Sequence, residues 1–259
     1  MLNIIGFTDM KKQRCVFLII LFFMFSGQTL AGMTEAEVAF EKEDYETAEK
    51  EYRVLANQGV AEAQFYLGAM YEYGSGVAKD ERQAVVWYTK AANQGLAKAQ
   101  NNLGTMYGRG RGVAKDGHQA VNWYTKAANQ EYVSAHLNLG YMYRYGFGVV
   151  KNVSQAVAWY TKAANQKDAY AQFKLGAMYA GGLGIAKDER QAVAWYTKAA
   201  NQGFAEAQIN LGKMYAIGSG VDSNKRKAYE LWLLAAEQGH SKAQNDLDIL
   251  CSKSPKVCQ

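Results

Sequence analysis

The sequence predicts an all-α protein, an α/α superhelical solenoid of stacked helix pairs, from three observations. A residue pattern repeats every 36 positions, apolar side chains recur at helical spacing in both halves of each repeat, and Pro255 is the single proline. A fixed period of this size is typical of solenoids, in which each unit buries its apolar face against its neighbours. The recurring Leu-Gly pair begins at Leu67, Leu103, Leu139, Leu175 and Leu211.

Residues 1–31 differ from the rest of the chain. Basic side chains within 11–14 precede an apolar run over 15–25, and small residues surround a cleavage position after Ala31. This order is typical of a secretory signal peptide. An uncleaved membrane anchor is the alternative, although the run is short for a membrane span. Translation could also begin at Met10. We expect a cleaved signal peptide and a mature protein in the periplasm or secreted.

Residues 32–58 predict an N-terminal capping helix pair, with helices over 33–42 and 45–57. Acidic and basic side chains are frequent on both segments. A polar outer face is what a terminal repeat requires.

Residues 59–239 contain five repeats, each predicted to form two helices. In the first repeat Leu67 and Tyr71 lie at i and i+4 of one helix, and Ala84, Tyr88 and Ala91 lie on one face of the next. First helices are expected near 60–73, 96–109, 132–145, 168–181 and 204–217. Second helices are expected near 81–93, 117–129, 153–165, 189–201 and 225–237.

The start of each second helix is marked by a residue that caps helices well. These residues are Asp80, Asp116, Asn152, Asp188 and Asn224. A side-chain oxygen at this position accepts a free backbone N–H. A glycine follows most second helices, and Glu131 and Lys167 replace it in two repeats, where we expect strained or differently closed turns.

Gly68 and its four equivalents lie inside a helix, where glycine costs about 1 kcal/mol relative to alanine. Its recurrence indicates a steric need, and we interpret it as a point of close helix packing.

Residues 240–259 predict a C-terminal capping helix, over about 240–251, and a tail. Cys251 and Cys258 lie at this end of the chain. An exported protein meets an oxidising compartment, so we expect a disulfide between them. Two free thiols are the alternative.

The repeat pattern AxAQxxLGxMYxxGxGVxKDxxQAVxWYTKAANQG resembles the Sel1-like repeat family, relatives of the tetratricopeptide repeats, over roughly residues 33–250. The resemblance implies an α/α superhelix that acts as an adaptor or binding protein. Some exported bacterial members look like immunity partners of toxins delivered into the periplasm, and others bind host proteins. Some members have been labelled cell-wall or β-lactam-related hydrolases.

Composition and motifs give no support for catalysis, a cofactor or a metal. His118, His136 and His240 have no second ligand at metal spacing, and the glycine-rich loops follow no predicted strand. The small positive net charge after signal cleavage gives no case for nucleic acid or membrane binding. We expect a monomer that is not an enzyme and has no stable membrane span after cleavage.

The positions that vary between repeats predict where a partner binds. They concentrate tyrosine and arginine in the middle repeats, and these types are enriched at interface hot spots. A solvated, variable surface is the alternative. The candidate residues are Tyr73, Arg109, Arg111, Tyr141, Arg144, Tyr145 and Phe147. The sequence therefore predicts an exported protein-interaction module, with a cell-wall or β-lactam-related hydrolase as the alternative.

Overall fold

The structure is a computed structural model that describes residues 31–258. These residues fall into two compact units, an N-terminal and a C-terminal unit, which divide between Lys115 and Asp116. The predicted signal peptide falls almost wholly on residues outside the described part of the chain. The described residues form helices and no strand, which confirms the all-α prediction.

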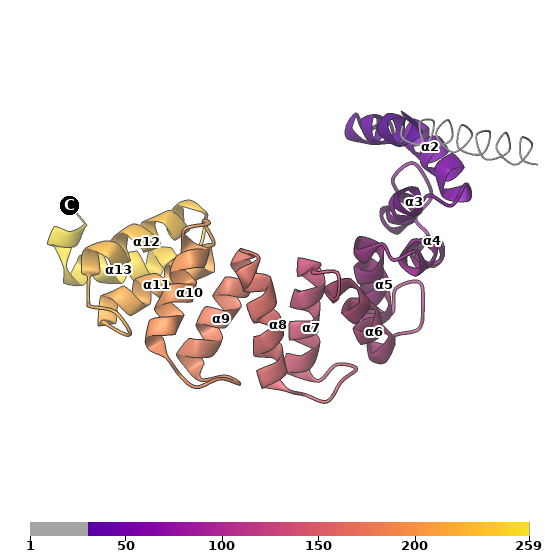
Figure 1. The fold of residues 1–259 in the computed structure, drawn as a ribbon. Coiled ribbons are helices and arrows are strands. Elements are labelled where there is room, and N and C mark those ends of the chain that lie inside the picture. The colour runs from indigo at the N-terminus through magenta and orange to yellow at the C-terminus, as the bar shows by residue number, and fades with distance from the viewer. Residues whose placement is uncertain (1–30, 259) are drawn as a thin grey trace, which may run out of the picture. The chain divides into compact units, whose positions relative to one another are not determined.

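The N-terminal unit consists of antiparallel helices that pack in chain order (Figure 1). A helix over residues 31–41 precedes α2 (Tyr45–Asn57), α3 (Ala61–Tyr73), α4 (Glu81–Asn93) and α5 (Ala97–Arg109). Its core includes Ala48, Tyr52, Leu55, Leu67, Met70 and Trp87. These residues lie at helical spacing, so each helix turns one apolar face toward its neighbours.

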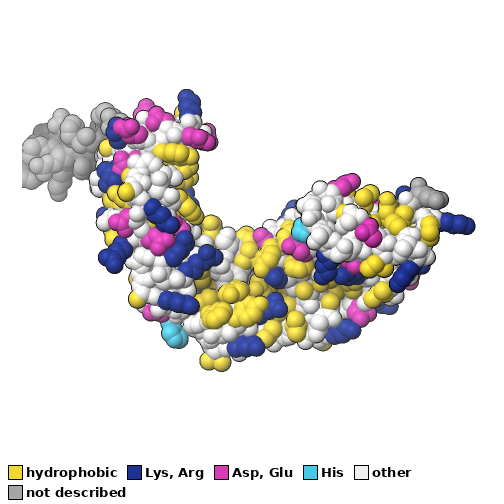
Figure 2. Space-filling model, turned by 180° about the vertical axis from the view of Figure 1, so that it is seen from behind, with side chains coloured by type: hydrophobic (Ala, Val, Ile, Leu, Met, Phe, Trp, Pro, Cys, Tyr) yellow, Lys and Arg dark blue, Asp and Glu magenta, His cyan; other side chains and the backbone are white. Residues whose placement is uncertain are grey.

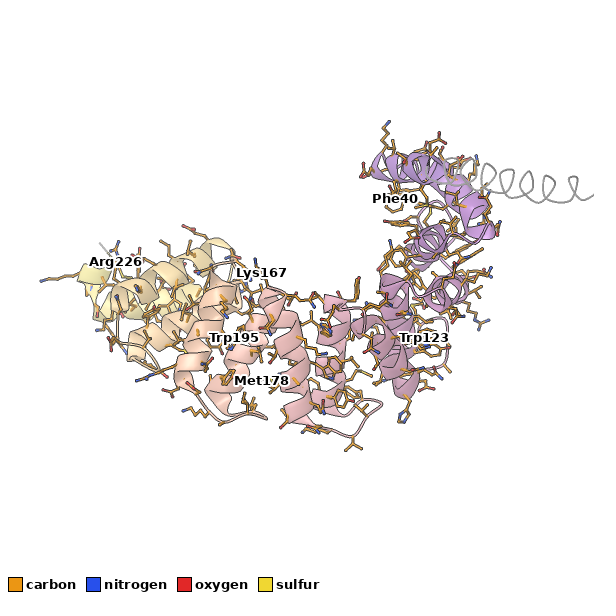
Figure 3. All side chains as sticks on the ribbon, viewed as in Figure 1. Phe40, Trp123, Lys167, Met178, Trp195 and Arg226 are labelled. Atoms are coloured by element: carbon orange, nitrogen blue, oxygen red, sulfur yellow. A yellow bond between two sulfur atoms is a disulfide. The ribbon has the colours of Figure 1, made fainter. Side chains whose placement is uncertain are left out.

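The C-terminal unit continues the same arrangement, as the neighbouring helices α7 to α10 show (Figure 1). Its helices are α6 (Gly117–Ala128), α7 (Val133–Tyr145), α8 (Val153–Asn165), α9 (Ala169–Gly181), α10 (Glu189–Ala200), α11 (Ala205–Ile217), α12 (Lys225–Glu237) and α13 (Ser241–Lys253), followed by the 3-10 helix η1 (Pro255–Val257). Met178 of α9 is fully buried, and Trp195 of α10 is half-buried (Figure 3). The repeat helices begin and end within one residue of the expected positions.

Side-chain caps begin the second helices, as the sequence predicts. Asp80 accepts from the backbone N–H groups of Arg82 and Gln83, and Asn152 accepts from that of Gln155. Each bond satisfies a donor that the first turn leaves free. The turns that follow α6 and α8 contain Glu131 and Lys167 at φ 57° and 66°, a left-handed conformation that is unfavourable for residues with a Cβ atom.

The recurrent helical glycine makes room for an aromatic ring. A Cβ atom at Gly140 would lie 2.8 Å from Cε1 of Tyr160, whose side chain is 2% exposed. Tyr88 stands in the same relation to Gly68. The steric need that we inferred is therefore present, but the neighbour is a side chain of the paired helix rather than its backbone.

The loop glycine Gly112 allows adjacent repeats to meet. A Cβ atom there would collide with the backbone carbonyl of Glu81, at the start of the preceding second helix. Gly112 also has φ 66°. Only glycine meets both demands at low cost.

A buried polar side chain ties each first helix to the turn before it. In four repeats a glutamine amide donates to an alanine carbonyl eight residues earlier. These glutamines are Gln64, Gln100, Gln172 and Gln208. In the third repeat His136 takes the place of glutamine, with Nε2 3.1 Å from the carbonyl oxygen of Ala128.

Candidate functional site

An exposed aromatic patch, formed by Tyr141, Tyr145 and Phe147, lies at the end of α7 in the C-terminal unit. The rings of Tyr141 and Tyr145 are 4.7 Å apart between centroids, and that of Phe147 is 5.7 Å from Tyr141. The three residues are 48%, 50% and 47% exposed. The guanidinium of Arg144 lies 5.4 Å from the ring centroid of Tyr145. Four of the seven candidate partner-binding residues are therefore neighbours.

Local backbone structure builds this patch. Tyr141 and Tyr145 are one helical turn apart and lie on the same face of α7. Gly146 takes a left-handed conformation, and the N–H of Phe147 then bonds to the carbonyl of Met142. The turn folds the Phe147 ring back onto the two tyrosines. The same closure recurs in the other repeats, but the aromatic residue at its end does not.

Tyr170 is a further exposed aromatic residue of the C-terminal unit, with its ring 6.2 Å from that of Phe204, and the sequence interpretation missed it. Burial raises the pKa of the Tyr160 phenol, and the hydroxyls of Tyr170, Tyr145 and Tyr141 are among its titratable neighbours, as is Arg144. Tyr170 is 41% exposed. A signal existed, because the equivalent positions in the other repeats are Glu62, Lys98, Ser134 and Glu206. Hydrophobic side chains gather on the face of the protein shown in Figure 2, with lysine and arginine side chains beside them.

The other three candidates, Tyr73, Arg109 and Arg111, lie around a polar pocket of about 370 Å³ in the N-terminal unit. Tyr73 ends α3 and is 71% exposed, and Arg109 ends α5 and is exposed. The pocket is lined by Glu72, Tyr73, Asn102, Thr105, Arg109 and Arg111. We refer to it below as the arginine pocket.

One wall of the arginine pocket is a network around the buried carboxylate of Glu72. Glu72 is 4% exposed and therefore buried, although the residue at its position varies between repeats. Its carboxylate accepts the Tyr88 hydroxyl at 2.6 Å and pairs with Nη2 of Arg111 at 2.7 Å. Burial, and then the bond to Glu72, raise the pKa of Tyr88. Arg111 is therefore held in place rather than free on the surface.

The described residues show no constellation typical of metal chemistry. Within residues 31–258 no three His, Cys, Asp or Glu side chains gather to hold a metal ion. His136 is fully buried in the repeat packing, and His240 precedes α13 as its capping residue. Over the same part of the chain, no helix has the length and apolar character that a membrane crossing requires.

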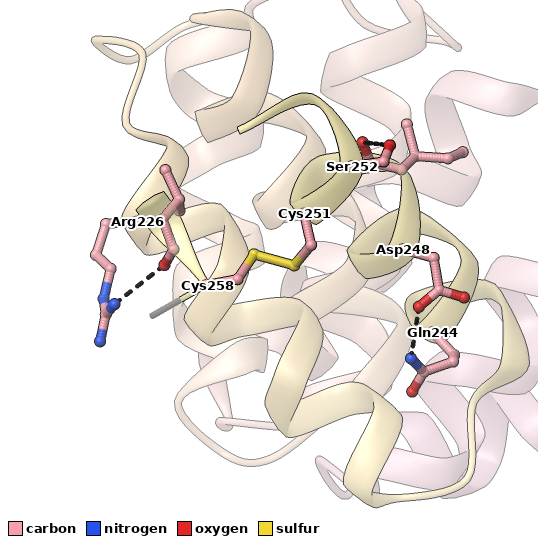
Figure 4. Close-up of a disulfide and its surroundings, with 8 residues drawn as sticks. Arg226, Gln244, Asp248, Cys251, Ser252 and Cys258 are labelled. Carbon is pink, nitrogen blue, oxygen red and sulfur yellow. Dashed lines mark hydrogen bonds between the residues drawn. A yellow bond between two sulfur atoms is a disulfide. The ribbon is translucent and has the colours of Figure 1, made fainter. Parts of the chain in front are cut away.

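Cys251 and Cys258 are joined by a disulfide that connects α13 to the end of η1 (Figure 4). Their Cα atoms are 5.7 Å apart, within the usual range for a disulfide. Arg226 of α12 donates to the carbonyl oxygen of Val257 at 3.0 Å. The tail is thus fastened to both of the last two helices.

Comparisons with known proteins point to one family. A family model described as Sel1 repeat matches residues 61–96, 97–132, 133–168, 169–204 and 205–240. No curated protein sequence matches the chain.

Solved structures agree with this match. The structure of c5321, described as a protective antigen of uropathogenic Escherichia coli with an SLR fold, aligns with a TM-score of 0.85 and 36% identity. That alignment covers 89% of this chain and 50% of c5321, so the chain spans about half the length of that relative. A Sel1 repeat protein from Oxalobacter formigenes aligns at 0.75 and 36% identity, over 83% of this chain and 86% of the other. Immunity protein Pa5087 from Pseudomonas aeruginosa aligns at 0.51 and 21% identity over 81% of each chain, which shows a shared fold alone.

Proposed function

The chain belongs to the Sel1 repeat family, and from this premise we propose that it is an exported module that binds a partner protein through the aromatic patch of its C-terminal unit. The observation that carries the proposal is the group of three half-exposed aromatic rings with Arg144 stacked beside them. Exposed apolar groups of this kind mark interaction sites on soluble proteins.

The chemistry of the patch suits a protein partner. Tyrosine offers a large contact area while few rotatable bonds are fixed on binding. Arginine pairs with carboxylates through two parallel hydrogen bonds. Other residues of the repeat form its buried core. The patch side chains can therefore contact a partner without leaving the core.

The first prediction tests this patch. We expect Arg144→Ala and Tyr145→Ala each to weaken partner binding by about 1 kcal/mol or more, as truncation of a hot-spot residue does. The thermal melt should hardly change because both residues lie outside the core. The partner is captured with the mature protein, and its dissociation constant is then measured with each purified variant.

Ile217→Ala is the matched control for the patch variants. Ile217 occupies the position of Tyr145 two repeats later, in the same unit, and is 78% exposed. It should leave affinity unchanged. Wild-type affinity in the Arg144 and Tyr145 variants would exclude the aromatic patch as the partner-binding site. A large fall in their melting temperature would mean that these side chains support the core.

A finer proposal concerns the partner. We propose that it is a toxin delivered into the periplasm, against which this protein confers immunity, or else a host protein. Structures described as immunity proteins from Pseudomonas aeruginosa share the fold at 21% and 18% identity. Expression of the toxin candidate from a neighbouring gene, with and without this protein, tests the immunity role. Turnover of a β-lactam reporter by the purified protein would instead support the hydrolase alternative.

A further inference from the structure

The arginine pocket differs from the corresponding place in every other repeat. The position of Glu72 holds Gly108, Arg144, Ala180 and Ala216 in the later repeats. The position of Arg111 holds Ser75, Phe147, Leu183 and Ser219. The ion pair between Glu72 and Arg111 is thus particular to the first junction of full repeats. Because the other repeats fold without it, the packing of the solenoid does not explain it.

Stability does not explain the pair either. Glu72 is buried and Arg111 is partly buried, with 30% of its side chain exposed. A charge that is taken out of water loses hydration, so such a pair is often no more stable than apolar residues of the same size. What the pair does is fix the guanidinium of Arg111 at the pocket wall, through Glu72 and, behind it, Tyr88. The Nε atom of Arg111 is buried without a hydrogen-bond partner among the described residues.

The charge of the pocket is set by Arg109. Glu72 balances Arg111, and no ion pair or hydrogen bond engages the exposed Arg109 guanidinium within the described chain. The lining therefore carries one positive charge in excess, beside the amide of Asn102 and the hydroxyl of Thr105. The exposed ring of Tyr73 stands at the rim.

We propose that the arginine pocket binds a carboxylate of the partner protein. An arginine fork is suited to the two oxygens of a carboxylate, and a positive pocket next to an aromatic ring favours an acidic segment with apolar neighbours. The inference rests on the proposed function, because it assumes that the ligand of this protein is another protein. It concerns the N-terminal unit alone, and its residues are separate from those of the aromatic patch.

Peptides test the pocket without knowledge of the partner. The first probe is a short peptide of glutamate, aspartate and serine with acetylated and amidated ends, and the second replaces its acidic residues by glutamine and asparagine. The third has the neutral residues and a free C-terminal carboxylate. Binding to the full mature protein is followed by NMR of the arginine Nε–Hε groups and by calorimetry. We expect the acidic peptide to bind and the blocked neutral one not to bind.

Arg109→Gln should weaken binding of the acidic peptide at least tenfold, and Arg109→Lys should weaken it less because the charge remains. Arg82→Gln is the matched control, since Arg82 is an exposed arginine of the same unit outside the pocket. It should change affinity less than twofold. The double variant Glu72→Gln with Arg111→Gln removes both charges of the ion pair together and should also weaken binding.

The peptide-binding results can support the inference or overturn it. Binding of the third peptide alone, lost in Arg109→Gln, would support the pocket and identify a terminal carboxylate as its ligand. Equal effects of Arg109→Gln and Arg82→Gln, or equal binding of the acidic and blocked neutral peptides, would overturn the inference. Tyr145→Ala should leave peptide binding unchanged, so the arginine pocket and the aromatic patch can fail independently.

Discussion

At the scale of single residues, one glycine in each repeat sets how closely paired helices can pack. At Gly140 the ring of Tyr160 occupies the space in which a side chain would lie. The equivalent relation holds between Gly176 and Tyr196. The intrinsic cost of glycine in a helix is offset by the burial of a large aromatic side chain, which contributes more than 1 kcal/mol of hydrophobic free energy.

Gly140→Leu should therefore lower the free energy of unfolding by about 1–3 kcal/mol, since an overpacked core forces side chains and backbone to shift. Thermal or urea unfolding measures the change. Val150→Leu in the same repeat is the control, because Val150 is 89% exposed and its enlargement meets no neighbour that must move. Equal stability of the wild-type and Gly140→Leu proteins would show that Tyr160 can be displaced without loss.

At the scale of helices and turns, His136 replaces the buried glutamine of the other repeats as both donor and acceptor. Gln172 donates to the carbonyl of Ala164 and accepts from Gln202. His136 has Nε2 beside the Ala128 carbonyl and Nδ1 3.5 Å from Nε2 of Gln166. A neutral imidazole with the proton on Nε2 satisfies both contacts. Protonation of Nδ1 would place a donor against the Gln166 amide.

The surroundings of His136 favour its neutral form. Burial lowers its pKa, which the bond to the Ala128 carbonyl and the carboxylate of Glu131, 3.9 Å away, oppose only in part. Lys162 on α8 lowers it further, and the ring stacks on Trp159. In the unfolded chain the imidazole regains a pKa of about 6.5 and binds a proton more readily.

Stability should therefore fall as the pH drops below about 6.5, because the unfolded state then binds a proton that the folded state refuses. The loss from this group is at most about 1.4 kcal/mol for each pH unit below that value. His136→Gln restores the residue found in the other four repeats and should remove this part of the pH dependence. Urea unfolding of both proteins at pH 7.5 and 5.0 measures it. Parallel pH profiles would show that His136 is protonated in the folded state as easily as in the unfolded one.

A disulfide between Cys251 and Cys258 joins the end of α13 to the C-terminal tail and closes a short loop. The disulfide spans a sequence separation of 7, and Val257 within the loop packs on the core formed with Trp232 and Leu250. Lys225 of α12 donates to the hydroxyl of Ser254 at 3.0 Å. The tail therefore covers apolar surface at the end of the repeat array, as a terminal cap must.

In the exported protein Cys251 and Cys258 should resist thiol labelling under denaturing, non-reducing conditions and react after reduction. In the chain-entropy model, a disulfide that closes a loop of this length adds about 2.5 kcal/mol to the free energy of unfolding. Cys258→Ser should therefore lower that free energy by no more than this amount. Labelling of both cysteines without reduction would refute the bond. Cys258→Ala serves as a second variant, to separate loss of the bond from the effect of a new hydroxyl.

At the scale of the whole molecule, each repeat packs on its sequence neighbours, so stability is approximately a sum of repeat and interface contributions. The helix contacts follow chain order within both the N-terminal and the C-terminal unit. The boundary between the units lies in the loop of the second repeat. Such a stack offers equivalent positions of successive repeats for binding.

We predict that the protein is exported. The basic, apolar and small-residue order of residues 11–31 leads us to expect removal of the segment up to Ala31. The intact mass of the exported protein checks the cleavage position. A mass that retains residues 17–25 would mean that the segment serves as an anchor. A change of Ala31 to a large residue should slow or shift the cleavage.

Much of the fold could be predicted because one packing problem recurs five times in the sequence. Leu67, Tyr88, Asp80 and their equivalents repeat in register, so periodicity and capping chemistry identify the helices and most of the core. The pairing of Cys251 and Cys258 was expected from the predicted export, with two free thiols as the alternative, and the structure contains the bond. The three residues of the aromatic patch and Arg144 stood out because they occupy positions at which the residue varies between repeats.

Whether a varying residue lies on the surface or in the core depends on contacts that form only when the chain folds. Position 72 varies between repeats, yet Glu72 is buried, because Arg111 of the next repeat and Tyr88 of the paired helix supply its partners. Those contacts join residues 39 and 16 positions apart and occur once, so no periodicity reveals them. Likewise, His136 contacts the carbonyl of the residue eight positions earlier, as the glutamines do in the other four repeats. A repeating pattern determines the packing common to all repeats, whereas a single exception acquires its role from the neighbours that the folded chain brings to it.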